Sequence, residues 1–375
     1  MKTLVTGAHG FIGRNLVVRL RRAGMDVAEV HRGSTPDDLR SGVRDAGVVF
    51  HLAGMNRPAP GIDADAEFAA GNVGSVDALL AAIDDVRARP LIVLSSSTQA
   101  AAANAYGRSK LAAEAALKAH ATSRGLAVVI YRLPGVFGKW GRPDYNSVVS
   151  TFCHRIARGQ AIEISDPARV IELVHVDDVV EQFQSHMSPP MPSGLSRGTV
   201  RPSFTISLGA LAARIQGFKA ARTTLEVADA ADPLTRRLLG TYLTYLPLSD
   251  LAYPLQQRVD ARGVLAELLK SPTFGQMFVS RTHPGVTRGN HYHDLKVEKF
   301  CVLEGDAIIR FRAILGDDVT EHRVSGRDFT VVDIPPGVTH SIENVGTSEL
   351  ITLFWASEIF DPARPDTYAN EVRRG

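Results

Sequence analysis

KTLVTGAHGFIG, at residues 2–13, joins a short apolar run to three glycines and the start of an amphipathic stretch. Residues 2–6 predict a β-strand and residues 11–23 predict a helix, so the glycines fall in the turn between them. Glycines allow a tight turn and a close backbone approach, and a helix N-terminus offers free N–H groups to an anion. Gly7, Gly10 and Gly13 therefore predict a cradle for the pyrophosphate of a dinucleotide.

The alternation of short apolar runs and amphipathic stretches continues to about residue 240. It predicts further strands at 26–30, 48–52, 91–95 and 127–132, and Ala-rich helices at 76–84 and 109–122. Buried strands separated by crossover helices form a parallel sheet that is covered on both faces. We therefore expect an α/β domain with a Rossmann-type doubly wound parallel sheet over residues 1–243, in which residues 188–201 form a loop.

The pattern changes after about residue 247, where helical stretches become rare. Short strands of β-branched and aromatic residues are predicted between Gly/Pro turns, at 276–280, 299–303, 307–312, 329–334 and 350–355. Such a series is typical of an all-β sandwich or barrel. We expect this second domain over residues 247–375, with 242–254 as the linker.

Composition narrows the class of protein. A chain of 375 residues suits two domains, and 45% hydrophobic with 22% charged residues is the balance of a globular protein. The net charge of +2 lacks the basic excess of nucleic-acid binding. Two distant cysteines, Cys153 and Cys301, fit a reducing compartment. No stretch approaches the roughly 20 apolar residues of a membrane span. We expect a cytoplasmic protein with neither a nucleic-acid nor a membrane partner.

The end of the second predicted strand bears on the choice of cofactor. It reads Val30-His31-Arg32 and carries no acidic residue. An acid at this place hydrogen-bonds the ribose of NAD, whereas an arginine pairs with the extra phosphate of NADP. Arg32, assisted by Arg14, therefore favours NADPH; the alternative is that Arg32 is an ordinary solvated arginine.

Tyr106-Gly-Arg-Ser-Lys110 carries the chemistry of the first domain. A spacing of four places Tyr106 and Lys110 on one helix face. The ammonium is expected to lower the pKa of the phenol, making Tyr106 a general acid toward a carbonyl oxygen. The preceding predicted strand runs into Ser95-Ser96-Ser97-Thr98, where a hydroxyl can hydrogen-bond that carbonyl, and Ser97 is preferred over Ser96 and Thr98.

A second site is predicted in the β-rich half, at His291, His293, Glu298 and His340. On a strand, His291 and His293 share a face, because side chains repeat every second residue. Glu298 begins the next strand, and His340 follows a Pro-Gly turn. Three imidazoles and a carboxylate suit zinc or another divalent first-row metal.

Residues 1–240 resemble the extended short-chain dehydrogenase/reductase family of sugar-nucleotide enzymes. His51-Leu-Ala-Gly54, Asn72, the stretch 131–138 and Asp178 are further matching landmarks. The resemblance implies that Ser97, Tyr106 and Lys110 catalyse hydride transfer on a nucleotide diphosphate sugar. It also implies a cofactor site made by Gly7, His9, Gly10, Phe11, Ile12, Gly13, Arg32, Leu52, Ala53, Gly54 and Lys110. Gly135 stands where many members carry a substrate-contacting Asn. His51 and Asp178 also admit structural roles, in packing and in helix capping.

The metal motif resembles the two signature motifs of the cupin family, which implies an all-β cupin barrel with a metal at its centre. The whole chain is similar to the bifunctional capsular polysaccharide enzymes of UDP-N-acetyl-L-fucosamine synthesis. In that family the cupin epimerises C3 of a UDP-4-keto-6-deoxy-N-acetylhexosamine. The reductase domain then reduces the C4 ketone with NADPH to UDP-2-acetamido-2,6-dideoxy-L-talose. Its members are homodimers, so we expect a homodimer acting on a UDP-sugar.

Two alternatives remain open. In one, only the reductase is catalytic and the cupin holds a structural metal. In the other, the protein is a nucleotide-sugar C4 epimerase or dehydratase with tightly held NAD; Arg32 disfavours it, as does the lack of an Asp-Glu or Thr-Asp pair after Ser97. Tyr292, Lys296 and His322 are conceivable acid–base groups for an epimerase.

Overall fold

The computed structural model describes residues 2–58, 61–188 and 194–373, which form two compact units. The first unit comprises Met1–Gln216 and Pro233–Leu246, and the second comprises Gly217–Asp232 and Pro247–Gly375. The chain therefore changes unit three times, where the sequence predicted a single linker. Residues 225–227 hydrogen-bond to Lys270 of the second unit, whereas Tyr242 and Tyr245 of the expected linker are buried in the first.

The first unit is built on a six-stranded sheet in which every neighbouring pair of strands is parallel. The strand order is β2 (Asp26–Val30), β1 (Lys2–Thr6), β3 (Ala46–His51), β4 (Leu91–Ser97), β5 (Val128–Leu133) and β8 (Leu195–Gly198). The predicted doubly wound parallel sheet is confirmed. The prediction of a loop over 188–201 is wrong where β8 pairs with β5, because a four-residue edge strand is too short to show a pattern.

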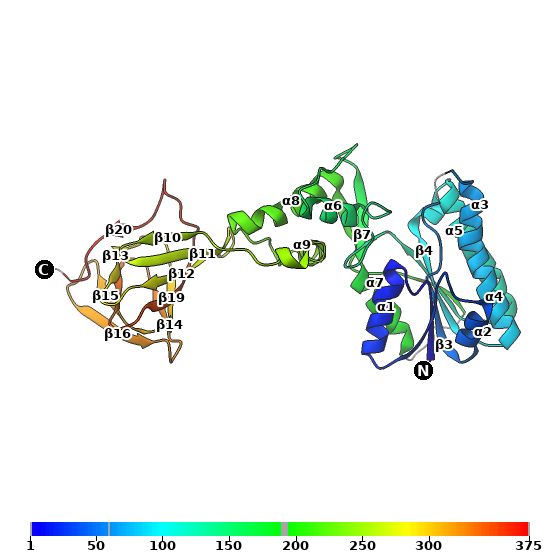
Figure 1. Ribbon diagram of the computed structural model, residues 1–375, viewed down its shortest axis with the longest axis horizontal. Coiled ribbons are helices and arrows are strands. Elements are labelled where there is room, and N and C mark those ends of the chain that lie inside the picture. Colours follow the sequence, from blue (N-terminus) through cyan, green and yellow to red (C-terminus); the bar gives the residue numbers. More distant parts are fainter. Residues whose placement is uncertain (1, 59–60, 189–193, 374–375) are drawn as a thin grey trace. The chain divides into compact units, whose positions relative to one another are not determined.

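Helices cover both faces of this sheet (Figure 1). α1 (Phe11–Arg22) and α7 (Val176–Gln184) pack on one face, and α2 (Pro36–Arg44), α4 (Gly74–Val86) and α5 (Ala105–Arg124) pack on the other. Within β1, Val5 belongs to the first core and Leu4 to the second, because successive side chains of a strand point to opposite faces. The carboxyl ends of the strands therefore form one fixed edge, at which ligands bind in open α/β sheets.

Shorter elements complete the first unit. α3 (Ala64–Phe68) and a π-helical turn, η1 (Ala69–Val73), lead into α4. A small sheet consists of β6 (Gly135–Phe137), β7 (Val170–His175) and β9 (Phe204–Ser207). The remaining helical elements are η2 (Thr98–Ala101), α6 (Val148–Ala157), η3 (Ser185–Met187), α8 (Leu208–Thr224), whose end enters the second unit, and α9 (Pro233–Leu243).

One helical run, Ala64–Val86, is long and apolar enough to cross a membrane by length and composition. The run is interrupted by acidic residues at 65, 67, 77, 84 and 85, so it is not an unbroken apolar stretch of the kind that the sequence analysis looked for. The run contains α4, whose Val76, Leu79 and Ile83 are buried against the sheet.

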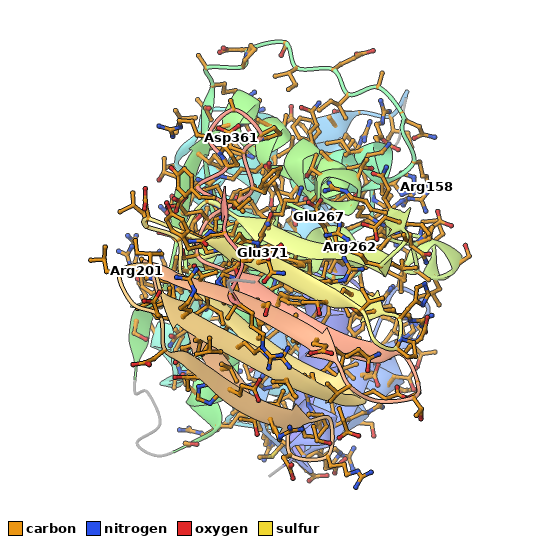
Figure 2. The ribbon with its side chains drawn as sticks, turned by 90° about the vertical axis from the view of Figure 1, so that its left-hand side faces the viewer. Arg158, Arg201, Arg262, Glu267, Asp361 and Glu371 are labelled. Carbon is orange, nitrogen blue, oxygen red and sulfur yellow. The ribbon has the colours of Figure 1, made fainter. Side chains whose placement is uncertain are left out.

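The second unit consists of two antiparallel sheets. One has the order β10 (Gln257–Asp260), β11 (Gly263–Ser271), β12 (Gly275–Thr282), β19 (Leu350–Ala356), β14 (Glu298–Glu304) and β17 (Val331–Ile334). The other has the order β16 (Val319–Ser325), β15 (Asp306–Ala313), β18 (Val338–Asn344), β13 (Thr287–Tyr292) and β20 (Tyr368–Ala369). A further helical turn, η4 (Leu248–Asp250), precedes them. Figure 2 looks onto these strands and labels Glu267 on β11.

Apolar side chains from both sheets fill the space between them, among them Phe300, Phe354, Ile309 and Ile342. The predicted all-β cupin barrel is confirmed. His340 lies beside this core, with its ring 5.7 Å from the ring of Phe300.

Candidate functional site

The glycine turn after β1 forms a cradle with the loop after β3. Gly7 adopts a left-handed φ of +67°, and a Cβ on Gly13 would lie 2.2 Å from the Gly7 carbonyl oxygen. A Cβ on Gly7 would lie 2.7 Å from the backbone nitrogen of Ala53, so Leu52-Ala53-Gly54 borders the same turn. Gly10 caps α1 without a side-chain hydrogen bond, which leaves the first N–H groups of that helix available to an anion.

Two histidines and an arginine lie at the end of β2. The rings of His9 and His31 are stacked, with centroids 4.0 Å apart and planes 12° apart. Arg32 is exposed and makes no hydrogen bond or ion pair with the described part of the chain, so its guanidinium is open to a ligand. The sequence analysis passed over Glu29, whose carboxylate pairs with Arg21 and lies 3.9 Å from Nε2 of His9.

Ser97 and Tyr106 face each other at the end of β4. Ser97 is the last residue of the strand and Tyr106 lies in the first turn of α5. Burial raises the pKa of the Tyr106 phenol, and the nearby Ser97 hydroxyl opposes this only partly. The expected lowering by Lys110 is therefore wrong for the protein alone. The phenol keeps its proton at neutral pH, which suits a proton donor.

Lys110 lies one turn further along α5, with Nζ 6.0 Å from the ring centroid of Tyr106. Nζ donates a hydrogen bond to the Ser95 carbonyl at 3.4 Å. Burial lowers the pKa of Lys110 to about 8, although the carboxylate of Glu114 opposes that shift.

Glu114, which sequence reasoning missed, explains why Ser97 rather than Ser96 faces the phenol. Its fully buried carboxylate accepts a hydrogen bond from Ser96 Oγ at 2.6 Å. It also accepts two from Arg132, from Nε and Nη2, each at 2.8 Å. The Ser96 hydroxyl is therefore bonded within the core and does not face the phenol. The signal for Glu114 was its position four residues after Lys110, on the same helix face.

His51, Asn72 and Asp178 make contacts within the first unit. His51 is buried, which lowers its pKa to about 3, and its Nδ1 lies 2.9 Å from Thr6 Oγ1. Asn72, in the π-helical turn η1, donates to the carbonyl of Met55 and accepts from its N–H, which fixes the loop after Gly54. Asp178 does not cap α7, because His175 holds the N-cap and the Asp178 carboxylate instead pairs with Arg237 at 2.8 Å.

The pKa of Lys110 predicts how cofactor binding depends on pH. Lys110 is protonated below about pH 8 and neutral above it, so an anionic cofactor should lose an attractive charge as the pH rises through that value. We expect the affinity for a reduced nicotinamide dinucleotide, measured by cofactor fluorescence, to fall by up to about tenfold per pH unit there. Lys110→Arg stays charged and should flatten this profile, whereas Lys118→Arg, on the same helix, should retain it. An unchanged profile in Lys110→Arg would assign the dependence to another group.

The structure brings the four predicted metal ligands of the second unit together. The ligand atoms of His291, His293, Glu298 and His340 all lie within 4.8 Å of one another. His291 on β13 is opposite His340 on β18, and Glu298 begins β14 in the other sheet. His293 and His340 are 1% and 0% exposed, so these two ligands are shielded from water, whereas His291 is only partly buried.

The hydrogen bonds of two of these histidines decide which nitrogen faces the cluster. His293 Nδ1 lies 2.5 Å from the Asp366 carbonyl, and His340 Nδ1 lies 3.2 Å from the Val338 carbonyl. A carbonyl only accepts, so each Nδ1 carries the proton and each Nε2 presents a lone pair. The Nε2 atoms are buried without hydrogen-bond partners, 3.2 and 3.4 Å from the Glu298 carboxylate. Acceptors that converge in this way fit a cation.

The three candidate acid–base groups each contact residues other than the four ligands. Tyr292 stacks on Tyr368, with ring centroids 5.2 Å apart. The buried Lys296 ammonium donates to the Pro365 carbonyl and to Thr367 Oγ1. His322 is exposed on β16, where its ring contacts Phe311. Lys296 is therefore a structural group in this arrangement.

Sequence reasoning also missed a groove of about 250 Å³ in the first unit. The groove is lined by Thr98, directly after Ser97, and by the ends of β5, β7 and β8. Arg197 and Arg201 are among the residues that line it. The signal in the sequence was a pair of arginines within the stretch that was predicted to be a loop.

Comparison with known proteins gives matches for both halves and for the whole chain. Residues 3–187 match the NAD-dependent epimerase/dehydratase family, and residues 258–368 match the polysaccharide biosynthesis C-terminal domain. The chain is 43% identical to the UDP-2-acetamido-2,6-beta-L-arabino-hexul-4-ose reductase of Pseudomonas aeruginosa, over 100% of both chains.

Solved structures are also similar to this chain. The capsular polysaccharide assembling protein CapF of Staphylococcus aureus superposes with a TM-score of 0.90 and 41% identity, over 99% of this chain and 100% of that one. MoeE5, in complex with UDP-glucuronic acid and NAD, covers 59% of this chain and 83% of its own, with 26% identity and a TM-score of 0.52.

Proposed function

The chain belongs to the family of the UDP-2-acetamido-2,6-beta-L-arabino-hexul-4-ose reductase and CapF, and we propose that it is a bifunctional enzyme acting on a UDP-linked 4-keto sugar. In this proposal the second unit epimerises C3 of a UDP-4-keto-6-deoxy-N-acetylhexosamine. The first unit then reduces the C4 ketone to give UDP-2-acetamido-2,6-dideoxy-L-talose. The observation that carries the proposal is the presence of two chemically distinct sites in one chain, both suited to a ketone.

The reduction needs a proton donor at the ketone oxygen, and the first unit supplies one. Bound NADPH provides the hydride that adds to C4. The Tyr106 phenol, which holds its proton at neutral pH, donates that proton to the oxygen as its negative charge develops. Ser97 hydrogen-bonds the same oxygen, and the positive charge of Lys110 favours the phenolate that remains. Arg197 and Arg201 line the groove beside Thr98, and in this proposal they pair with the diphosphate of the sugar nucleotide.

The second unit is suited to the epimerisation. A divalent cation held by His291, His293, Glu298 and His340 would polarise the C4 ketone and so acidify the C3–H. The shielding of His293 and His340 strengthens electrostatic attraction within the site, because little water competes there. The same ketone thus serves both units, first as the acidifying group and then as the hydride acceptor.

A structural metal in the second unit is the competing proposal. Four protein ligands can fill a tetrahedral zinc site completely, as structural zinc sites do, whereas catalytic sites keep a position open. In that case the protein is a monofunctional 4-ketoreductase that receives its sugar already epimerised.

Solvent exchange distinguishes the two proposals. The enzyme is incubated with the UDP-4-keto-6-deoxy-N-acetylhexosamine in D₂O without NADPH, and the sugar is examined by NMR. The bifunctional proposal expects deuterium at C3 that disappears when a chelator removes the metal. Absence of exchange by the metal-loaded protein would leave only the reductase.

The proposed preference for NADPH is tested at Arg32. Because its guanidinium has no partner within the described chain, we propose that it pairs with the 2′-phosphate of NADPH. Arg32→Ala should weaken NADPH binding by about 10- to 100-fold, as expected for the loss of a charge-assisted hydrogen bond. NADH binding should be unchanged. Arg22→Ala, at the exposed end of α1, is the matched control, and equal losses in the two variants would contradict a specific contact.

A further inference from the structure

From the contacts of the C-terminal tail we infer that Asp366 is a positioning residue of the metal site, which it builds by fixing both the tautomer of His293 and the loop 294–296. This inference rests on the proposed metal site. Asp366 lies in the tail between Asp361 and Glu371, both labelled in Figure 2, and is 73 residues from His293 in sequence.

The main chain of Asp366 acts on His293 directly. Its carbonyl oxygen lies 2.5 Å from His293 Nδ1, and a carbonyl can only accept a hydrogen bond there. The proton is held on Nδ1, and the lone pair of Nε2 is directed at Glu298 and the centre of the cluster. The tautomer and the ring plane of His293 are therefore fixed before the metal binds. The free energy of metal binding then does not include the cost of ordering this ring.

The side chain of Asp366 acts on the loop that joins His293 to Glu298. One carboxylate oxygen accepts the N–H of Asp294 at 2.9 Å, and the other accepts those of Leu295 and Lys296 at 3.0 and 2.7 Å. Three consecutive N–H groups thus converge on one carboxylate. This sets the path of the chain between two ligands, and with it their separation.

Neighbouring contacts hold Asp366 in place. It adopts a left-handed φ of +38°, which is unusual for a residue with a side chain and directs its carbonyl and its carboxylate to the same loop. Lys296 Nζ donates to the residues on either side, Pro365 and Thr367. Further along the tail, the buried Arg312 donates to the Glu371 and Val372 carbonyls.

The test measures zinc affinity of the full chain by competition with a chelator. Asp366→Ala should bind zinc about 10- to 100-fold more weakly than the wild type, the usual effect of removing an outer-shell partner. Asp366→Asn keeps one acceptor oxygen and should recover part of the loss. Asp361→Ala is the matched control, because Asp361 accepts the Ala363 N–H in the same tail and has no contact with the loop 294–296 among the described residues. Circular dichroism confirms that each variant is folded.

A spectroscopic readout separates positioning from general stability. In metal-free protein labelled with ¹⁵N-histidine, Asp366→Ala should lower the Nδ1-protonated population of His293, and Asp361→Ala should not. In the cobalt-loaded protein, the visible bands should change for Asp366→Ala alone. If the wild type binds no metal, the proposed site itself is wrong. If the wild type and Asp366→Ala bind zinc equally and show the same tautomer, only the role of Asp366 is wrong.

Discussion

Tyr106→Phe should lower the kcat for NADPH oxidation with the 4-keto sugar by about 10²- to 10⁴-fold, the usual contribution of a general acid. The substitution removes only the hydroxyl that donates the proton. The ring stays packed against Phe68, 5.4 Å away between centroids, so the fold should be retained. Deuterium exchange at C3 should be intact, because it depends on the second unit. NADPH absorbance and NMR of the sugar measure the two effects on one sample.

The matched control for this loss is Tyr245→Phe. Tyr245 is also a buried tyrosine of the first unit, and its hydroxyl donates to the Gly141 carbonyl at 2.7 Å, away from the nucleotide cradle. This variant should lose some stability and keep its kcat. Retention of more than about a tenth of the activity by Tyr106→Phe would exclude the phenol as the proton donor.

The sequence predicted the fold well where the pattern is local and repeated. β1 and β2 have the predicted bounds, because the apolar residues that mark each strand are neighbours in sequence, Leu4 and Val5 in β1 and Val27 and Ala28 in β2. β8 was missed because its pairing with β5 depends on residues more than 60 positions away. The start of the second domain at residue 247 was predicted, but the assignment of residues 217–232 to the second unit was missed, because the pairing of Glu226 with Lys270 is likewise a long-range contact.

The residues of the candidate sites show the same difference between local patterns and long-range contacts. The proximity of residues at short spacings, Tyr106 with Lys110 and His291 with His293, could be predicted from the sequence. Glu114 and Asp366 act through partners that the fold brings to them, Arg132 in one case and His293 in the other. The direction of the Tyr106 pKa shift also could not be predicted, because it depends on how deeply the phenol is buried.

His340→Ala should abolish high-affinity metal binding, with a loss greater than the roughly 100-fold expected for an outer-shell partner. The variant removes one of the converging acceptors and leaves a cavity at a fully buried position. C3 exchange should stop with the loss of the metal. His322→Ala, which removes an exposed histidine of the same unit, should bind zinc normally. Chelator competition and exchange in D₂O measure both effects, and exchange that persists in His340→Ala without bound metal would contradict the metal-assisted epimerisation.

The two variants together test whether one ketone serves both units. Alone, Tyr106→Phe should accumulate the epimerised 4-keto sugar, and His340→Ala should leave the original sugar unreduced. A mixture of the two should restore NADPH oxidation, because each variant retains the unit that the other lacks and the epimerised ketone can diffuse between molecules. If His340→Ala alone reduces the sugar at the wild-type rate, the reductase does not require prior epimerisation. The second unit then serves the protein through its metal-stabilised fold rather than through catalysis.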